Sequence, residues 1–389
     1  MKERPFVTKK REDELLSFYR STVRTRSYSD EEEAIARLIL AEMERLDFDE
    51  AYIDRVGNVV GRVGKGERIL HFDAHMDTVR ADDAENWTAP PFSAETVNGM
   101  VYGRGTADMK GGLSAAVYAA ALAKKCGLLG GKTVYITCSV CEEYCDGACL
   151  TNFYQDSGVK PDYCIICEPS RNMITLGHTG KVQARIRTYG VSAHASAPEK
   201  GINAVYEMAE IIGRVEKLNE ALRQKENGGT VVLSNISCVT ASLNAVPSEC
   251  EIYLDRRLRF GETTAGAFKE LDALIEGKRA AWELGTLVHT SWTGEKLVFE
   301  PANDPWRIAE DHELTRACSR AYEEAFGVPP EKYHFWDFGT NAIIPAARGI
   351  PCIGFGPGDY RLAHMTDECC DPEEVVDACE FYVDLIGTL

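Results

Sequence analysis

The chain has 389 residues, enough for two domains that each bury a hydrophobic core. Its 44% hydrophobic and 27% charged residues are typical of a soluble globular protein, and no apolar run approaches the roughly 20 residues that cross a membrane. A formal net charge of −18 without a basic stripe argues against nucleic acid as a partner. The stretch Met1–Phe6 contains no signal-peptide core, so we expect a cytoplasmic protein.

The first part of the chain alternates between helical and extended patterns. Helical spacing covers residues 10–47, where Ser29 and Glu32 predict a capping box for the second helix. A Gly-rich segment, 103–112, opens a helix over 113–126 but lacks the phosphate-loop and dinucleotide spacings. Strands are expected at 50–54, 58–63, 68–72, 132–140 and 162–167. This alternation predicts an α/β domain, in which ligands gather at the carboxyl ends of strands.

Acidic side chains recur at the ends of these strands. In the stretch 71–79, His-Phe-Asp-Ala-His-Met-Asp-Thr-Val, His75 and Asp77 share one face of an extended chain. Asp108 stands just before the first turn of the predicted helix. Four carboxylates follow directly on strands: Asp77, Glu142, Glu143 and Glu168. We therefore expect these groups to meet in one site.

The pattern changes at about residue 179. The order strand, helix, strand, strand, helix predicts a small α+β domain inserted into the first one. The expected elements cover 182–187, 203–222, 231–238, 250–258 and 264–275. The chain then returns to the first domain, with a helix at 314–326 and a strand at 351–355. The predicted catalytic domain is discontinuous, 1–178 and 297–389, and the inserted lid or dimerisation domain covers 179–296.

Fourteen cysteines require an interpretation. Without an export signal, reduced thiols are expected rather than a disulfide framework. One cluster of cysteines resembles a set of zinc or iron–sulfur ligands: Cys138, Cys141, Cys145 and Cys149. Cys138, however, belongs to an apolar strand pattern in which a thiol packs as a small hydrophobic group. We favour buried cysteines over a cysteine metal site.

Carboxylates that converge on one site repel each other and raise each other's pKa unless cations are present. Two divalent cations bridged by one carboxylate remove this conflict, and ligands of the His, Asp and Glu types suit zinc, manganese or cobalt. Such a pair can hold a hydroxide and polarise a carbonyl, as amide hydrolysis requires. Glu142 and Glu143 cannot both enter one coordination sphere if the strand stays extended. One is expected to be a ligand and the other a proton shuttle.

In their order along the chain, the motifs resemble those of the dinuclear-zinc aminoacylase family. That family contains acetylornithine deacetylase, succinyl-diaminopimelate desuccinylase, carboxypeptidase G-type enzymes and several dipeptidases. The motifs are His75-x-Asp77, Gly103-Arg104-Gly105-Thr106-x-Asp108-x-Lys110-Gly111-Gly112, Glu142-Glu143, Glu168-Pro169 and Ala363-His364. Flanking residues look most like the selenium-metabolism-linked hydrolase subgroup. The resemblance implies a zinc-peptidase-like α/β catalytic domain, with a mixed sheet flanked by helices, and an inserted α+β domain.

The resemblance also implies two metal ions, most simply zinc. His75, Asp108 and Glu168 would hold one metal, and Asp108, Glu143 and His364 the other, so that Asp108 bridges the two.

Catalytic roles follow from the same resemblance. Asp77 would orient His75, and Glu142 would take a proton from the metal-bridging water and pass it to the leaving amine. His194, in Ser-Ala-His-Ala-Ser-x-Pro, matches a histidine that reaches the partner subunit's active site in dimeric members and stabilises the oxyanion. Taken alone, His194 would be read as a turn residue on the surface of the lid.

Substrate contacts are implied at Asn244, Arg257, Gly339 and Thr340, which match positions at the carboxylate end of the substrate. Taken alone, Asn244 before Val-Pro would be a turn residue and Arg257 a solvated strand residue. His178 stands where some relatives have a substrate-binding arginine. The resemblance therefore does not determine the identity of the acyl group or side chain of the substrate.

The expected function is hydrolysis of the amide bond of an N-acyl amino acid or a small peptide with a free carboxylate. The alternatives are a dipeptidase or carboxypeptidase, a catalytically silent binding protein, and a thiol-based redox or cluster protein. The presence of Glu142 argues against the silent protein. A homodimer is expected by resemblance, and neither nucleic acid nor a membrane is an expected partner.

Overall fold

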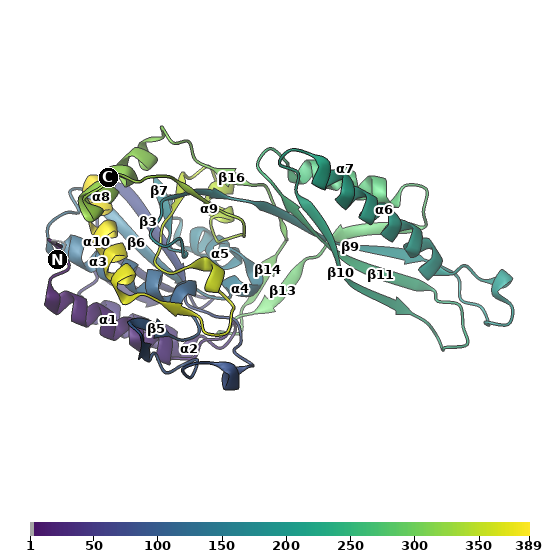
Figure 1. Cartoon of the computed structure of the whole chain (residues 1–389), viewed down its shortest axis with the longest axis horizontal. Helices are drawn as coiled ribbons and strands as arrows, with labels where there is room; N and C mark the ends of the chain where they lie inside the picture. Colours follow the sequence, from purple (N-terminus) through teal and green to yellow (C-terminus); the bar gives the residue numbers. More distant parts are fainter. Residues whose placement is uncertain (1–3) are drawn as a thin grey trace.

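Two β-sheets divide the chain into a larger domain and a narrower inserted domain (Figure 1). The computed structural model describes residues 4–389, so the first three residues of the N-terminal stretch lie outside the described part. Each sheet has its own buried hydrophobic cluster. Within residues 4–389 no helix combines the length and apolar character that a membrane span requires.

The larger domain is built on a nine-stranded sheet in the order β1-β2-β6-β3-β7-β18-β8-β16, with β17 paired to β8. β3 (Arg68–His75) runs parallel to both β6 (Lys132–Ser139) and β7 (Tyr163–Ile166), so the carboxyl ends of these strands meet at one edge. The other strands are β1 (Glu50–Ile53), β2 (Val59–Gly64), β8 (Thr175–His178), β16 (Trp306–Arg307), β17 (His334–Trp336) and β18 (Cys352–Gly354). Because β2 and β16 are antiparallel to their neighbours, the predicted mixed sheet is confirmed.

Helices cover both faces of this sheet (Figure 1). Successive residues of β3 face opposite sides: the ring of His71 packs against Phe153 of α5 (Ala148–Ser157), and Phe72 packs against Tyr382 of α10 (Pro372–Thr388). α3 (Gly111–Lys125) lies so close to the sheet that a Cβ on Gly112 would sit 2.0 Å from the carbonyl oxygen of Cys167. The remaining helices are α1 (Lys9–Arg24), α2 (Glu33–Arg45), α4 (Glu142–Cys145), α8 (Glu313–Phe326) and α9 (Ile343–Ala347).

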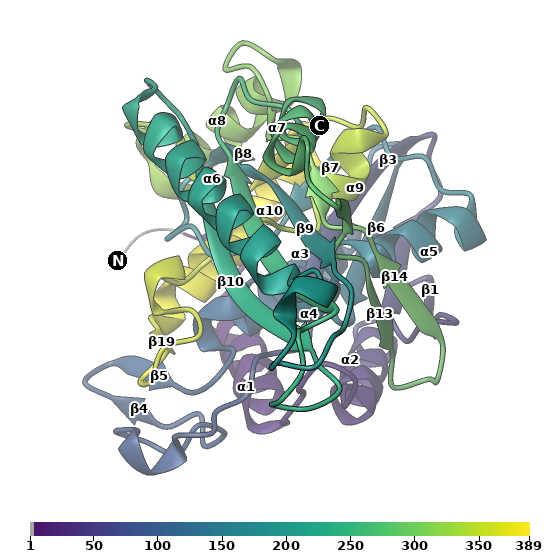
Figure 2. The ribbon, with the colours of Figure 1, turned by 90° about the vertical axis from the view of Figure 1, so that its right-hand side faces the viewer.

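The inserted domain has an antiparallel sheet in the order β10-β11-β9-β12. One face is covered by α6 (Ala204–Gln224) and α7 (Thr264–Ile275), and the end-on view shows α6 and β10 in front (Figure 2). From Val182 onward, β9 (Gly180–Tyr189) buries every second residue, as half-exposed strands do. The other strands are β10 (Thr230–Val239), β11 (Glu249–Leu258) and β12 (Ala280–Leu284).

Two connections join the domains. β8 leads into β9, and the returning strands β15 (Ala302–Asn303) and β16 pair with β9 and β8 respectively. The hairpin of β13 (Leu287–Thr290) and β14 (Lys296–Phe299) comes before this return. The predicted boundary at 296 assigns most of it to the inserted domain, but its tip is attached to the larger domain, where the Trp292 indole donates to Gly57 O at 3.3 Å.

The predicted capping box at the start of α2 is wrong. α2 begins at Glu33, and Glu32 makes no side-chain cap. Instead, Ser29 Oγ donates to Asp77 at 2.6 Å, and Glu32 accepts from the backbone amide of Cys141 at 3.0 Å. Tertiary contacts with the carboxyl edge of the sheet therefore take both side chains away from the helix end.

Candidate active site

Two groups of histidine and carboxylate meet at the carboxyl edge of the large sheet and share Asp108. His75 Nε2 lies 2.9 Å from Asp108 Oδ1 and 3.6 Å from Glu168 Oε1. His364 Nε2 lies 3.3 Å from Asp108 Oδ2 and 2.8 Å from Glu143 Oε2. Asp108 thus faces one imidazole with each of its oxygens, which is the geometry of a bridging carboxylate.

Each side chain of this cluster comes from a different segment. His75 ends β3, and Glu168 follows β7. Asp108 lies in the turn before α3, where its peptide bond to Met109 is cis. Glu142 and Glu143 do not continue β6 as an extended strand, because Cys141 has a φ of 55° and the chain turns there into α4. After this turn, Glu143 lies close to His75 and Asp108, and Glu142 close to His75 and Glu168.

Asp77 holds the start of α4. Its carboxylate accepts hydrogen bonds from the backbone amides of Glu142 at 3.1 Å and Glu143 at 3.2 Å, and from the hydroxyl of Ser29. His75 Nδ1 lies 3.0 Å from the backbone carbonyl oxygen of Asp77 and 3.6 Å from its carboxylate. Asp77 therefore contacts His75 mainly through the Asp77 carbonyl oxygen, while the Asp77 carboxylate binds the backbone amides of the two glutamates.

Two buried glutamates that sequence reasoning missed support the same cluster. Glu32 binds the amide of Cys141 from the side of α2. Glu368 accepts from the amides of Ala107 at 2.9 Å and Asp108 at 3.1 Å, and pairs with Arg104 at 2.8 Å. Glu368 lies four residues after His364, so its place beside the motif was the available signal. Glu32 was marked only by the capping-box pattern, which predicts a different role for it.

The cluster is crowded with negative charge. Burial, together with the charges of neighbouring carboxylates, raises the pKa of Glu142, Glu143 and Glu168 above the ordinary glutamate value. Burial lowers the pKa of His75, but Glu168 and Asp108 outweigh it and hold that pKa well above its usual range. The hydrogen bonds to Asp108 and Glu143 raise the pKa of His364 to about 10. Cations among these oxygens would relieve the repulsion.

The donor set fits divalent cations. Ligand atoms of His75, Asp108 and Glu143 lie within 4.8 Å of one another, as do those of His75, Glu142 and Glu168. Imidazole nitrogens and carboxylate oxygens are the ligands that zinc, cobalt and manganese accept in hydrolases. Within residues 4–389, the groups close enough to share an ion contain no cysteine. The cysteines named above are buried free thiols, so the cluster hypothesis has no support.

A pocket of 390 Å³ opens over the cluster and is bounded by the inserted domain. Arg257 and Gly339 line it, whereas Thr340 is buried beside it and accepts from the amide of Ala342. Lys181, which sequence reasoning missed, lies directly opposite Arg257 across β9 and β11. Paired residues of antiparallel strands share a face, so both cations point toward the carboxylates.

His194 and Asn244, two of the predicted residues, lie far from this pocket, in the inserted domain. His194 and Asn244 are exposed and close to each other, since Ala195 N donates to Asn244 O at 2.8 Å and His194 pairs with Ala245. The loops that carry them are at the end of the inserted domain farthest from the larger domain (Figure 1). His178 is buried at the connection, where its Nδ1 bonds to Thr179 O at 2.7 Å.

Comparison with known proteins decides the family. Residues 71–388 match the model of peptidase family M20/M25/M40. The chain belongs to this family. It is 36% identical over 374 residues to YgeY of Escherichia coli (strain K12), described as uncharacterized, covering 95% of this chain and 93% of YgeY. It is 29% identical over 320 residues to acetylornithine deacetylase of Vibrio vulnificus (strain CMCP6), covering 80% and 79%.

Solved structures show the same fold. Aminopeptidase PepT from Bacillus cereus superposes with a TM-score of 0.72 at 20% identity, covering 97% of this chain and 98% of PepT. YXEP of Bacillus subtilis, described as a dinuclear metal binding peptidase of the M20 family, gives 0.67 at 14% identity and covers 97% of both chains. Membership of the family makes this chain a metal-dependent hydrolase of amide or peptide bonds.

Proposed function

We propose that the chain hydrolyses the amide bond of an N-acyl amino acid, or of a small peptide, that carries a free carboxylate. The observation that carries this proposal is the pair of histidine–carboxylate groups that share Asp108, with Glu142 buried beside them. His75, Asp108 and Glu168 would hold one divalent cation, and Asp108, Glu143 and His364 the other, with zinc the simplest choice and cobalt or manganese acceptable. Bound cations would polarise the scissile carbonyl and lower the pKa of water.

Glu142 is the proposed proton carrier. Its burial and the neighbouring carboxylates raise its pKa above the ordinary glutamate value, which favours a role in proton transfer. It would accept a proton from the attacking water and deliver it to the leaving nitrogen. Arg257 and Lys181 would receive the substrate carboxylate. Both side chains are already paired with an acidic residue: Arg257 with Asp255 at 2.7 Å, and Lys181 with Asp146 at 2.6 Å. Their positions are therefore fixed before substrate arrives.

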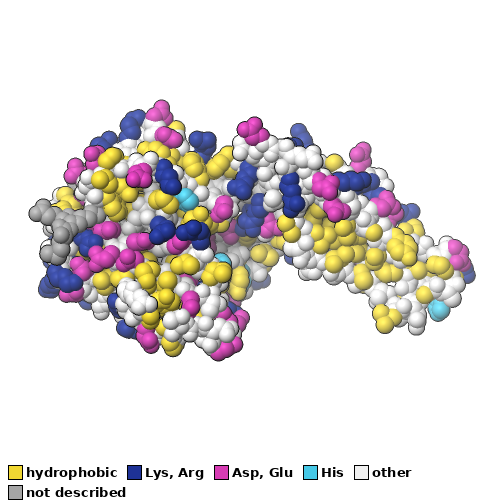
Figure 3. All heavy atoms as spheres, viewed as in Figure 1, with side chains coloured by type: hydrophobic (Ala, Val, Ile, Leu, Met, Phe, Trp, Pro, Cys, Tyr) yellow, Lys and Arg dark blue, Asp and Glu magenta, His cyan; other side chains and the backbone are white. Residues whose placement is uncertain are grey.

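A second copy of the chain is the proposed source of the oxyanion contact. His194 and Asn244 are remote from the pocket of their own chain, so they could serve only another site. Among residues 4–389, β10 pairs only with β11 and so has one free edge. A band of hydrophobic side chains crosses the inserted domain over α6 and β10 (Figure 3). Tyr206, Val232 and Ile236 are 73%, 53% and 51% exposed. Pairing of two β10 edges in a homodimer would cover these side chains.

The test is a substrate panel with the metal-loaded, full-length protein. N-acetyl and N-succinyl amino acids and dipeptides are scored by release of a free amine, which separates a deacylase from a dipeptidase or carboxypeptidase. Glu142→Gln should lower turnover by about 10²- to 10⁴-fold with metal content and fold retained. Glu323→Gln, an exposed change on α8, is the matched control. Loss of metal in Glu142→Gln would refute its role as proton carrier, and a parent protein inert toward the whole panel would favour the silent binding protein.

A further inference from the structure

His364 differs from the other members of the histidine–carboxylate cluster in its surroundings. Its side chain is 51% exposed, whereas those of His75, Asp108, Glu143 and Glu168 are 12% exposed or less. Neighbouring side chains therefore enclose four members of the cluster and fix their positions. The position of the His364 imidazole depends instead on the backbone that carries it.

The backbone around His364 needs support from the rest of the fold. His364 and Asp367 have φ values of 64° and 63°, in the left-handed region that residues other than glycine rarely adopt. Such conformations persist only where the surrounding structure imposes them. Glu368 anchors the end of this segment, because its buried carboxylate accepts from the amides of Ala107 and Asp108. Residues 364–367 require contacts of their own.

A loop from the first part of the chain supplies these contacts on the outer side. The Thr88 backbone amide and hydroxyl both donate to the Asp367 carboxylate, at 2.6 and 2.8 Å. The Thr366 hydroxyl donates to the Asp83 carboxylate. Asp83 also accepts from the Trp87 indole at 3.2 Å, which fixes its orientation. We call residues 83–88 the latch loop.

Arg104 joins the latch loop to the same segment on the buried side. Its guanidinium carbon lies 5.1 Å from the ring centre of Trp87 in the latch loop. Its Nη1 donates to Met365 O at 3.1 Å, and its Nη2 donates to His364 O at 3.5 Å. Arg104 itself is buried. The backbone that carries His364 is therefore held between Arg104 and the latch loop.

We propose that the latch loop is a positioning element of the metal site: it fixes residues 364–368 and so keeps His364 within reach of Asp108 and Glu143. Loss of the latch contacts would weaken binding of the cation that these three side chains hold, and would leave the other cation bound as before. This inference rests on the proposed pair of cations. It adds to that proposal residues whose contacts are with the backbone segment of a ligand and not with the cluster itself.

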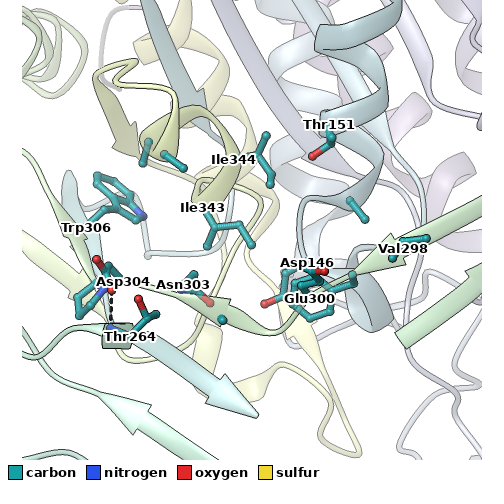
Figure 4. Close-up of a pocket in the computed structure, with 16 residues that line it drawn as sticks. Asp146, Thr151, Thr264, Val298, Glu300, Asn303, Asp304, Trp306, Ile343 and Ile344 are labelled. Atoms are coloured by element: carbon teal, nitrogen blue, oxygen red, sulfur yellow. Dashed lines mark hydrogen bonds between the residues drawn. The ribbon is translucent and has the colours of Figure 1, made fainter. Parts of the chain in front are cut away.

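The latch does not depend on the connection between the two domains. The contacts described above all lie within the catalytic domain. The cavity at the domain connection, of 660 Å³, is lined by both domains, for example by Thr264 of α7 and Ile343 of α9 (Figure 4). Residues 83–88 and 364–368 do not line it. Movement of the inserted domain would therefore leave the latch contacts in place.

Stepwise removal of zinc from the metal-loaded, full-length protein with a chelator tests the proposal. Bound zinc per chain is measured at each free zinc concentration. Asp367→Ala removes both hydrogen bonds from Thr88, and Asp83→Ala removes the one from Thr366. In either variant, one of two cations should bind about 10- to 100-fold more weakly, as is typical when a partner that orients a ligand is lost. Asp82→Ala, which removes the same charge from an exposed neighbouring position, is the matched control and should change neither affinity.

The outcomes separate the latch from the metal pair. Fewer than two cations per chain in the parent would refute the proposed pair, whereas two cations that bind unchanged in both latch variants would refute the latch alone. An equal loss for both cations would also refute it, because the loop would then support the whole site. Both Asp83 and Asp367 are half-buried, so either variant suffices if the other does not fold. In a His364→Ala background the latch changes should weaken the remaining cation no further; a further loss would overturn the assignment to His364.

Discussion

Replacement of Asp77 by alanine should destabilise the protein and displace Glu142 and Glu143 together. The Asp77 carboxylate accepts the two backbone amides that begin α4, at 3.1 and 3.2 Å, and it is fully buried. A buried donor left without a partner costs about 1–3 kcal/mol, so two amides amount to about 2–6 kcal/mol. Because single domains are typically stable by about 5–15 kcal/mol, Asp77→Ala should fold but unfold more easily.

Three measurements on each variant test this reasoning: the free energy of unfolding in urea, bound metal per chain, and turnover. Asp77→Ala should lower all three, because misplaced Glu143 weakens metal binding and misplaced Glu142 slows proton transfer. Asp77→Asn retains one acceptor oxygen and should lose about half as much stability. Asp311→Ala, an exposed change, should alter none of the three.

The outcome also separates two roles for Asp77. If Asp77→Ala lost metal while its unfolding free energy stayed at the parent value, the carboxylate would act through His75 and the assignment to α4 would be refuted. A loss of stability with unchanged metal content would show that Asp77 stabilises α4 through the amides of Glu142 and Glu143 in the parent protein, but that Glu143 binds no metal.

Other consequences can be measured independently. Mixing His194→Ala with Glu142→Gln should restore about a quarter of parental turnover after subunit exchange, since half of the dimers are mixed and one of their two sites is complete; no recovery would refute the partner contribution. Ile236→Lys, on the free edge of β10, should yield a monomer by light scattering with an unchanged Tm. Burial lowers the pKa of His71 from 6.5 to about 3, so stability should fall as pH drops from 6.5 toward 3, by about 1.4 kcal/mol per pH unit, and His71→Gln should flatten this slope.

The part of the site that sequence could predict is the part attached to strand ends. His75 ends β3 and Glu168 follows its parallel neighbour β7, and parallel strands bring their carboxyl ends to one edge. Glu32 could not be found in this way, because it reaches Cys141 across 109 residues and no local pattern records a contact of that kind. The same limit explains the failed capping box: Ser29 had a suitable spacing for a helix cap, but Asp77 is the acceptor it meets in the folded chain.

The turn at Cys141 explains how adjacent glutamates can perform different tasks. In an extended strand, neighbours point to opposite faces, and one of the two would leave the site. At Cys141 the φ of 55° starts a helical turn, after which Glu143 lies within reach of His75 and Asp108, and Glu142 within reach of His75 and Glu168. A non-glycine residue in this conformation is strained and needs support from its surroundings. Glu32 binds the amide before the turn and Asp77 the two amides after it, so the assignment of ligand and proton carrier depends on residues that touch neither metal nor substrate.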